Sequence, residues 1–432
     1  MINRIVHGAL PLLSLLLAAG APAQNEDQNS ALFARQKSGL VVIEVADRTS
    51  GNKNVIGSGF LVDAGAGLFA TNYHVVSEYV LHPERFVLRF KSGKEGGGDL
   101  EVAALDVIHD LALVRAAPDA LPAGAWQFAL ADALPAQGAP VLAMGNPYDI
   151  GISVVPGTYN GLIEKQYRRH IHFTGALNPG MSGGPAVNAA GAVIGVNVAG
   201  AGNSVSFLVP GEYLVALLAG WADDEEAVLD PAAWRERIVE DIKRHQSGML
   251  DDLLAGDWSG SEFGPLLIPT AVRPYVDCSG GTTDDDGEER YRAHTSDCGV
   301  NDRIFLSRQL DSGMIEIDFG WYESEQYNRF QFYRMFEDIS FFPANQGGKK
   351  DLTGFRCQED IVRFDNLGDV PFKTTLCVRE YLDYAGLYDV LFAAKSLLDR
   401  PEGVFLHYTL AGVPRDKAEA FHQCFIGAVR WK

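Results

Sequence analysis

The chain has 432 residues, of which 47% are hydrophobic and 21% are charged. This balance is typical of a folded globular protein and excludes a disordered or fibrous one, and the length predicts two domains behind any leader. The formal net charge of −20 argues against nucleic acid and against an anionic membrane surface as partners, because both would repel the protein.

The first 23 residues are typical of a secretory signal peptide. Arg4 supplies a positive charge, residues 9–19 form a short apolar run, and Ala-Pro-Ala at 21–23 is a cleavage pattern that predicts a mature chain starting at Gln24. An uncleaved anchor is the alternative. No later segment has the roughly 18 apolar residues that a membrane span needs. We therefore expect a periplasmic or secreted protein without membrane insertion after cleavage.

Short β-branched runs separated by turn residues follow, from residue 38 to about residue 210. Examples are residues 40–43, 86–90, 141–143 and 192–196, with Gly-rich segments between them. Many short strands at this spacing, with almost no helical periodicity, indicate an all-β sandwich or barrel. We expect this first folded unit to occupy residues 24–221.

The pattern changes after residue 210. Residues 214–218 predict a closing helix, and an acidic linker at 223–226 precedes a second helix that begins at Pro231. Residues 222–256 are thus expected to be linker and helix. Beyond them, strands at 303–306, 314–319 and 404–410 mix with helices, the last at 416–431. We expect a C-terminal α+β domain of unknown function at residues 257–432.

All five cysteines lie in this C-terminal part. In an exported protein such clustering indicates disulfides, although cysteine is also a good small core residue. Proximity favours Cys278–Cys298 and Cys357–Cys377. The odd count leaves at least one cysteine unpaired.

Three motifs carry the candidate chemistry. His74 lies in the block TNYHVV at 71–76, Asp110 begins the block DLALV at 110–114, and Ser182 lies in the block NPGMSGGP at 178–185. A serine hydroxyl becomes a good nucleophile when an imidazole takes its proton, and the imidazole needs a carboxylate that fixes its tautomer. The chain order His, Asp, Ser is the trypsin arrangement. We therefore predict His74, Asp110 and Ser182 as the catalytic triad of a serine endopeptidase.

These blocks resemble those of trypsin-like serine proteases, most closely the bacterial HtrA (Deg) proteases. The family's GSGF, GNPF and GFAIP segments also have counterparts at residues 57–60, 145–148 and 206–210, so the resemblance covers roughly residues 35–220. It implies a chymotrypsin-like double β-barrel, polypeptide substrates, a role in protein quality control or processing, and an oxyanion hole formed by the N–H groups of Gly180 and Ser182. A homo-oligomer is compatible with it.

Two features depart from the family pattern. Met181 stands where HtrA proteases have Asn and trypsins have Asp, which argues against trypsin-style activation by a freed N-terminus. No PDZ domain is recognisable after the protease part, and this puts the family's usual regulation and cage-like assembly in doubt.

The resemblance also implies where substrate binds. Ala176, six residues before the nucleophile, corresponds to the base of the S1 pocket and offers no acid to Lys or Arg. The strand formed by Val198, Ala199 and Gly200 is expected to pair with the substrate backbone, and Val205 to narrow the pocket. We predict cleavage after small aliphatic residues such as Val or Ala.

Other interpretations of these residues are weaker. Ser182 also fits the G-x-S-x-G elbow of α/β-hydrolases, but strand-like sequence follows it where that fold needs a helix. His170 and His172 are two residues apart on a predicted strand, so they share a face and could bind a metal ion. The neighbouring Arg168 and Arg169 instead favour an exposed basic strand or loop. The acidic run 284–289 lacks the ligand spacing of an EF-hand and favours a solvated loop. We expect no metal and no cofactor.

The C-terminal part matches no motif with attached chemistry. Two hypotheses remain: a module that recruits substrates or a partner, and a cap on the active site. For the whole chain, the rival to a protease is a catalytically silent exported binding or chaperone-like protein on a protease scaffold.

Overall fold

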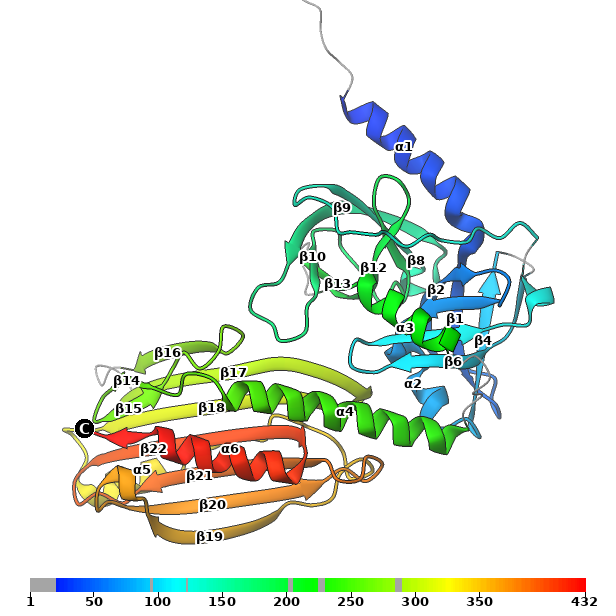
Figure 1. The fold of residues 1–432 in the computed structure, drawn as a ribbon. Helices are drawn as coiled ribbons and strands as arrows, with labels where there is room; N and C mark the ends of the chain where they lie inside the picture. Colours follow the sequence, from blue (N-terminus) through cyan, green and yellow to red (C-terminus); the bar gives the residue numbers. More distant parts are fainter. Residues whose placement is uncertain (1–20, 94–95, 122, 201–204, 224–229, 284–289) are drawn as a thin grey trace, which may run out of the picture.

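The computed structural model describes residues 21–432 except 94–95, 122, 201–204, 224–229 and 284–289. The expected signal peptide up to residue 20, most of the acidic linker and the acidic run at 284–289 therefore lie outside the described residues. The described chain begins with helix α1 (Ala21–Gln36), whose C-terminal part packs through Leu32 and Phe33 on a core cluster that contains residues of both β units (Figure 1).

The first β unit is a seven-stranded antiparallel sheet in the order β5-β4-β1-β2-β3-β7-β6. Buried and exposed residues alternate along β4, as expected for a strand with one face on a core. Helix α2 (Tyr73–Leu81) connects β3 to β4 and packs its valines into this core. The strands are β1 (Leu40–Asp47), β2 (Lys53–Asp63), β3 (Leu68–Thr71), β4 (Phe86–Ser92), β5 (Gly96–Asp99), β6 (Glu101–Asp106) and β7 (Leu111–Arg115).

The second β unit is a closed barrel in the order β10-β13-β12-β11-β8-β9, followed by helix α3 (Gly211–Asp223). Its strands are β8 (Pro140–Gly145), β9 (Ser153–Leu162), β10 (Ile171–Phe173), β11 (Pro185–Val187), β12 (Val193–Gly200) and β13 (Ser206–Pro210). The expected mainly β fold of the N-terminal part is confirmed, with a seven-stranded sheet followed by a closed barrel. Short 3₁₀ turns lie at Lys37–Gly39, Pro118–Ala120, Pro147–Asp149 and Asp365–Leu367.

The C-terminal part is α+β, as expected. Its centre is a seven-stranded antiparallel sheet in the order β16-β17-β18-β22-β21-β20-β19, with α4 and α6 along one face (Figure 1). The strands are β16 (Asp277–Thr283), β17 (Arg292–Ser307), β18 (Leu310–Glu323), β19 (Arg356–Arg363), β20 (Pro371–Glu380), β21 (Tyr388–Ser396) and β22 (Glu402–Val413). The helices are α4 (Pro231–Leu254), α5 (Arg329–Glu337) and α6 (Arg415–Ala428).

One predicted boundary in this part is wrong. The final helix ends at Ala428, whereas the pattern predicted that it would continue to residue 431. Arg430 and Trp431 instead form β23 and pair with β15 (Leu266–Pro269), which itself pairs with β14 (Gly260–Phe263). The backbone groups at the end of a helix have no partner within the helix. By pairing with the free edge of β15, the last residues of the chain find hydrogen-bond partners for their backbone.

Both favoured disulfides are present. Cys278 is bonded to Cys298 across β16 and β17, and Cys357 to Cys377 across β19 and β20. Each bond therefore fastens an outer strand of the large sheet to its inner neighbour. Cys424 is a free thiol on α6.

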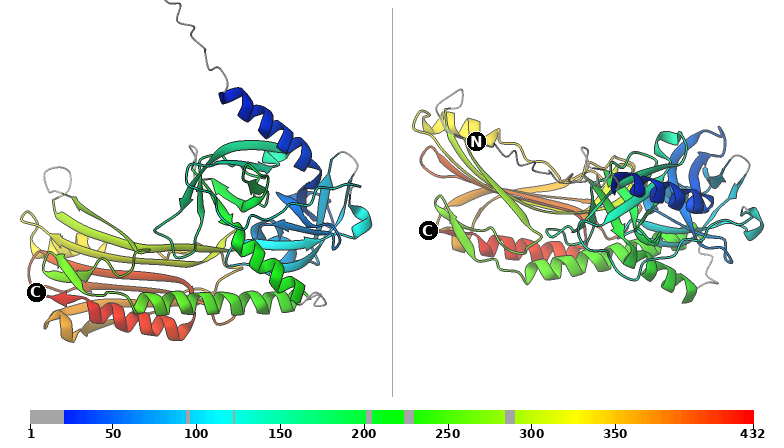
Figure 2. Two further views of the ribbon diagram at one scale, coloured as in Figure 1. Left: turned by 45° about the horizontal axis from the view of Figure 1, so that its top comes forward. Right: turned by 90° about the horizontal axis from the view of Figure 1, so that it is seen from above.

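The N-terminal and C-terminal parts share one hydrophobic core. The cluster that contains Val75, Val76 and Val80 of α2 also contains Trp234 and Ile238 of α4. Residues from β17, β18 and the segment around Tyr384 belong to it as well. Figure 2 shows α4 and the ends of β17 and β18 lying against the first β unit. Within the described residues, no helix is long and apolar enough to cross a membrane.

Candidate active site

His74 lies in the first turn of α2, where helix geometry fixes its backbone. Asn72 is the N-cap residue, and its side-chain amide donates to the carbonyl of Asp110 at 2.7 Å. Asp110 receives two hydrogen bonds from His74: the backbone N–H donates to Oδ1 at 2.8 Å, and ring Nδ1 lies 2.7 Å from Oδ2. One carboxylate thus holds both the main chain and the ring of the histidine. This arrangement leaves Nε2 as the nitrogen available to accept a proton.

Asp110 itself adopts a left-handed backbone conformation, with φ of 55°. Non-glycine residues rarely occupy this region, and such strain often accompanies functional sites. The conformation turns the carboxylate at the start of β7 (Leu111–Arg115) toward α2, while the Asn72 amide satisfies the main-chain carbonyl. The strained residue is therefore held from both its side chain and its main chain.

The surroundings of His74 shift its pKa. Burial lowers the pKa, but the charge of Asp110 and the hydrogen bond to it outweigh burial, and the pKa is raised above its ordinary value. The His74 side chain is still 26% exposed, so solvent and a substrate can reach the ring. A histidine of this kind is a good proton acceptor near neutral pH.

Ser182 lies on a tight turn between β10 and β11 that two glycines make possible. Gly180 has φ of 96° and Gly183 has φ of 84°. A Cβ at Gly180 would lie 2.4 Å from the Asn146 carbonyl oxygen, and one at Gly183 would lie 2.2 Å from the Ser58 carbonyl oxygen. Both the backbone conformation and the lack of space therefore require glycine at these positions.

Two backbone N–H groups of this turn have no partner among the described residues: those of Gly180 and Ser182. The neighbouring carbonyls, in contrast, are engaged. The Pro179 carbonyl accepts from the Tyr148 N–H at 2.8 Å, and the Gly180 carbonyl accepts from the Ser58 hydroxyl at 2.7 Å. With both carbonyls tied away, the two N–H groups are available to an incoming oxyanion.

The Ser182 hydroxyl is oriented away from the histidine. It donates to the Val198 carbonyl of β12 at 2.9 Å, and within the described part of the chain no hydrogen bond joins it to the His74 ring. The structure therefore brings His74 and Asp110 into direct contact. It holds Ser182 in a rotamer that a side-chain rotation would have to change.

Two buried polar residues, Ser58 and Asn197, hold the serine turn, and the sequence motifs did not predict this role. The Ser58 N–H donates to the Ser182 carbonyl at 2.8 Å, and its hydroxyl accepts from the Asn146 N–H at 2.8 Å. The Asn197 side-chain amide donates to the carbonyls of Met144 and Met181 at 2.9 and 3.2 Å. Ser58 stood within the GSGF block that signalled the resemblance, whereas a lone polar residue in strand β12 gave no signal of its own.

Met181, the residue that departs from the family pattern, is fully buried. It lies against Gly145, where a Cβ would come within 2.8 Å of the Met181 Cα. An apolar side chain can occupy this site without a counter-charge. The turn is therefore held by packing and by the Asn197 amide.

The expected substrate-binding residues lie on the segments around the serine. Val198 is next to Ser182 through the hydrogen bond above, and Ala199 and Gly200 continue the same strand to its end. Ala176 is exposed in the segment after β10, and Val205 is exposed immediately before β13. These last two segments meet, because the Leu177 N–H donates to the Ser206 hydroxyl at 3.2 Å.

The expectation of an exposed basic strand or loop around residue 168 is wrong for Arg168. Its side chain is buried, and its Nε donates to Asp302 of β17 at 2.7 Å. Arg169 remains exposed and pairs with Glu212 at 2.8 Å. Burial, followed by the charge of Arg168, lowers the pKa of His170 to about 4. Among the described residues no group of three or more His, Cys, Asp or Glu side chains could hold a metal ion.

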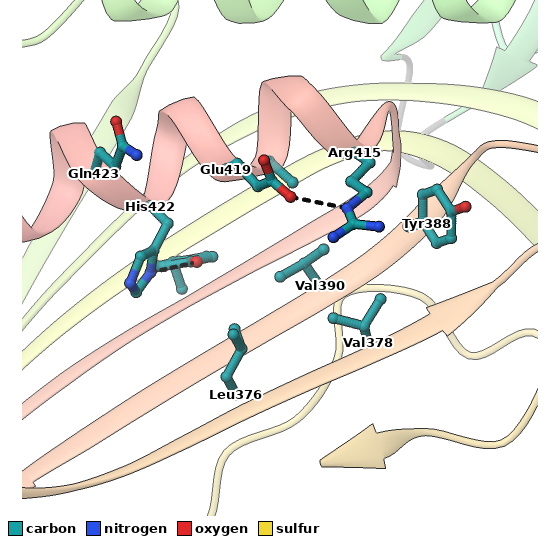
Figure 3. A pocket seen from close by; sticks show the side chains of 10 residues that line it. Leu376, Val378, Tyr388, Val390, Arg415, Glu419, His422 and Gln423 are labelled. Carbon is teal, nitrogen blue, oxygen red and sulfur yellow. Dashed lines mark hydrogen bonds and ion pairs between the residues drawn. The ribbon is translucent and has the colours of Figure 1, made fainter. Parts of the chain in front are cut away.

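A separate pocket of about 430 Å³ lies between α6 and the large sheet (Figure 3). Its walls are mainly apolar, with Leu376 and Val390 on the strands. Four of its polar side chains pair with one another: Arg415 pairs with Glu419, and the Tyr408 hydroxyl lies 2.9 Å from His422 Nδ1. None of its lining residues is one of the predicted catalytic or substrate-binding residues.

Part of the chain is similar to known proteins. Residues 57–196 match the family model described as a trypsin-like peptidase domain. This span includes the His74, Asp110 and Ser182 motifs.

The relatives of this domain are HtrA-type proteases. The periplasmic serine endoprotease DegP of Salmonella typhimurium is 32% identical over 166 residues, which are 36% of this chain and 33% of DegP. The serine protease HTRA3 of Homo sapiens is 28% identical over 228 residues, 50% of this chain and 48% of HTRA3. The chain thus spans about a third to a half of the length of these curated relatives.

The chain is also similar to the serine endoprotease from Yersinia pestis, a solved structure. The TM-score is 0.39 at 21% identity, covering 46% of this chain and 67% of that one.

Proposed function

We propose that the protein is a serine endopeptidase in which Ser182 is the nucleophile, His74 the general base and Asp110 the group that orients His74. The observation that carries this proposal is the double hydrogen bond between the Asp110 carboxylate and His74, at 2.8 and 2.7 Å. A carboxylate in this position selects the tautomer that leaves Nε2 free and stabilises the imidazolium. The serine endoprotease names of the relatives point in the same direction.

The reaction follows from these groups. As Ser182 Oγ bonds to the scissile carbonyl carbon, His74 Nε2 takes the hydroxyl proton. The negative charge that develops on the carbonyl oxygen is stabilised by the N–H groups of Gly180 and Ser182. The C–N bond then breaks, and the imidazolium gives its proton to the leaving amine. Water, deprotonated by the same imidazole, releases the acyl group from Ser182.

The catalytically silent alternative also has an observation in its favour. The Ser182 hydroxyl donates to the Val198 carbonyl at 2.9 Å instead of to His74. If this hydrogen bond persists when substrate is present, the serine cannot attack. We favour the active protease because a serine hydroxyl changes direction by rotation about its Cα–Cβ bond, and catalytic hydrogen bonds are often incomplete before substrate binds.

The specificity that we propose is cleavage after small aliphatic residues such as Val or Ala. Ala176 would lie at the base of the S1 pocket, the strand Val198, Ala199 and Gly200 would pair with the substrate backbone, and Val205 would narrow the pocket. The support is chemical, since none of these side chains is an acid that would attract Lys or Arg at P1.

We further propose that residues 1–23 direct export to the periplasm or beyond, and that residues 24–221 form the protease domain. The linker and helix would then occupy residues 222–256, and the C-terminal domain residues 257–432. The two disulfides support an oxidising compartment. A role in protein quality control or processing fits the periplasmic location in the name of DegP.

A fluorophosphonate probe tests the proposal. We expect covalent labelling of the native protein and none of Ser182→Ala, together with at least a thousandfold loss of turnover on a peptide substrate. Ser153→Ala, which removes a surface hydroxyl from the same barrel, is the matched control and should react like the native chain. A native protein that neither reacts with the probe nor cleaves a peptide library would establish the silent alternative.

A further inference from the structure

The end of strand β17 reaches the helix that carries His74. Residues 302–308, called here the β17 tip, comprise the last part of β17 and the first residue of the turn to β18. The Tyr73 hydroxyl, one residue before His74, donates to the Leu306 carbonyl at 3.2 Å, and Tyr73 is fully buried. The backbone of the C-terminal part is thus hydrogen-bonded to the first turn of α2.

Phe305, on the same tip, touches the catalytic histidine itself. Its ring centroid lies 5.8 Å from that of His74 with an interplanar angle of 67°, and 6.4 Å from that of Tyr73. Edge-to-face contacts at these distances are favourable. Phe305 is only partly buried, so part of this residue remains accessible to solvent.

Arg168 connects the tip to the loop of the catalytic carboxylate. This buried side chain donates to the Ile108 carbonyl, two residues before Asp110, and also to the Arg303 carbonyl. Its Nε donates to Asp302, whose other oxygen lies 2.7 Å from His245 Nε2 on α4. Burial raises the pKa of Asp302, but Arg168 and His245 outweigh burial and hold it below its ordinary value. The carboxylate therefore stays ionised and keeps this network together.

The contacts of the tip indicate which side of the scissile bond it faces. Among the described residues, its hydrogen bonds, ion pairs and ring contacts to the N-terminal part go to α2, to Asn54 at the start of β2, and to Arg168. None goes to residues 193–198 of β12, the strand proposed above to pair with the acyl part of the substrate. The imidazole delivers its proton to the leaving amine, so a ring packed on His74 can border the leaving segment.

We propose that the β17 tip is part of the catalytic centre: Tyr73 and its Leu306 partner position His74, and Phe305 forms an apolar subsite for the residue directly after the scissile bond. This inference rests on the protease function proposed above. It gives the C-terminal part a third role, distinct from a tethered recruiter and from an inhibitory cap. The substrate class that follows is a polypeptide with an apolar side chain at the first position of the leaving segment.

Two substrates with the same acyl sequence separate this subsite from general damage. One is a peptidyl p-nitroanilide, which has no residue after the scissile bond. The other is an internally quenched peptide that carries either Leu or Asp at that position. We expect native protein to prefer Leu over Asp by about tenfold in kcat/KM. Phe305→Ala should lose most of this preference, and its kcat/KM should fall more on the Leu peptide than on the Asp peptide or on the p-nitroanilide.

Tyr73→Phe tests the positioning part, because it removes only the hydroxyl that reaches Leu306. We expect kcat to fall two- to tenfold on both substrates with KM unchanged. Tyr333→Phe is the matched control, since Tyr333 lies on α5 in a separate C-terminal cluster and its hydroxyl likewise donates to a backbone carbonyl, that of Leu398. Its kcat should equal that of native protein.

The outcomes are distinguishable. If native protein is labelled at Ser182 but shows no preference between Leu and Asp, the subsite is refuted while the protease function stands, and no variant has to fold for this result. The subsite would also be refuted if Phe305→Ala lowered kcat/KM equally on the quenched Leu peptide and on the p-nitroanilide. If native protein is not labelled at all, the proposed function fails and this inference fails with it. Phe305→Leu, which keeps apolar bulk, should retain the preference for Leu.

Discussion

Ser58→Ala is the substitution that most directly tests how the serine turn is held. The Ser58 hydroxyl donates to the Gly180 carbonyl at 2.7 Å and accepts from the Asn146 N–H at 2.8 Å. The first of these bonds holds the Gly180–Met181 peptide, which adjoins the peptide that carries the Gly180 N–H. Alanine removes both hydrogen bonds without removing the backbone bond from the Ser58 N–H to Ser182.

The expected magnitude has a stability part and a catalytic part. Each buried polar group that loses its partner costs about 1–3 kcal/mol. Because the Gly180 carbonyl is near solvent and water can replace part of the loss, we expect about 2 kcal/mol of lost unfolding free energy in total. If the freed Gly180–Met181 peptide lets the adjoining Pro179–Gly180 peptide rotate, the Gly180 N–H is lost as an oxyanion donor, and removal of such a donor lowers kcat by about 10²–10³.

Ser312→Ala supplies the control for this measurement. Ser312 is also fully buried and its hydroxyl bonds to the carbonyls of Ala411 and Gly412, within the large C-terminal sheet. Both variants should lower the melting temperature, but only Ser58→Ala should lower kcat and the rate of fluorophosphonate labelling. A Ser58→Ala protein that is destabilised like the control yet retains kcat within a factor of two would refute the argument that this hydroxyl shapes the oxyanion site.

Three further predictions concern the same centre. Since His74 acts as a base only when neutral, its raised pKa should place the acid limb of the kcat profile above the ordinary value of about 6.5. Asp110→Asn removes the charge that raises the His74 pKa and leaves only burial, which lowers it. The acid limb of the kcat profile should therefore move to lower pH while kcat at pH 7 falls about 10⁴-fold, and an acid limb that stays in place would contradict this. Gly183→Ala places a Cβ 2.2 Å from the Ser58 carbonyl oxygen and should abolish probe labelling even where circular dichroism shows a folded protein. Removal of residues 224–432 exposes apolar residues of the shared core and should give an aggregating or strongly destabilised fragment by calorimetry, whereas a soluble, fully active fragment would disprove the shared core.

The sequence contained most of what positions the catalytic residues within the N-terminal part. Each motif is local: residues 73–81 form a helix that begins directly after Asn72, and Gly183 supplies the positive φ that the serine turn needs. Strand alternation and the helix start at Pro231, with Asp230 accepting from the Ala233 N–H as N-cap, are equally local. Short-range backbone chemistry of this kind can be predicted because the information lies within a few residues.

The contacts between the two parts could not be predicted, for a physical reason. Arg168 lies next to Arg169 in a polar segment, which favours an exposed interpretation. It is buried because Asp302, 134 residues further along the chain, neutralises it. Nothing near either residue indicates the other. Tyr73 and Phe305 are likewise ordinary aromatic residues until α2 and β17 are placed together.

The shared core also changes how a truncation should be interpreted. The recruiter and cap hypotheses both assume a C-terminal part that can be removed while the protease stays folded. Because α2 packs against α4 and β17, its apolar face would meet water in a truncated chain, and burying one Val or Ile side chain there contributes about 1.5–3 kcal/mol. Lost activity after truncation would therefore not show recruitment, since misplacement of His74 explains it as well. Point variants that keep this core, such as Phe305→Leu and Tyr73→Phe, separate the roles that a deletion would combine.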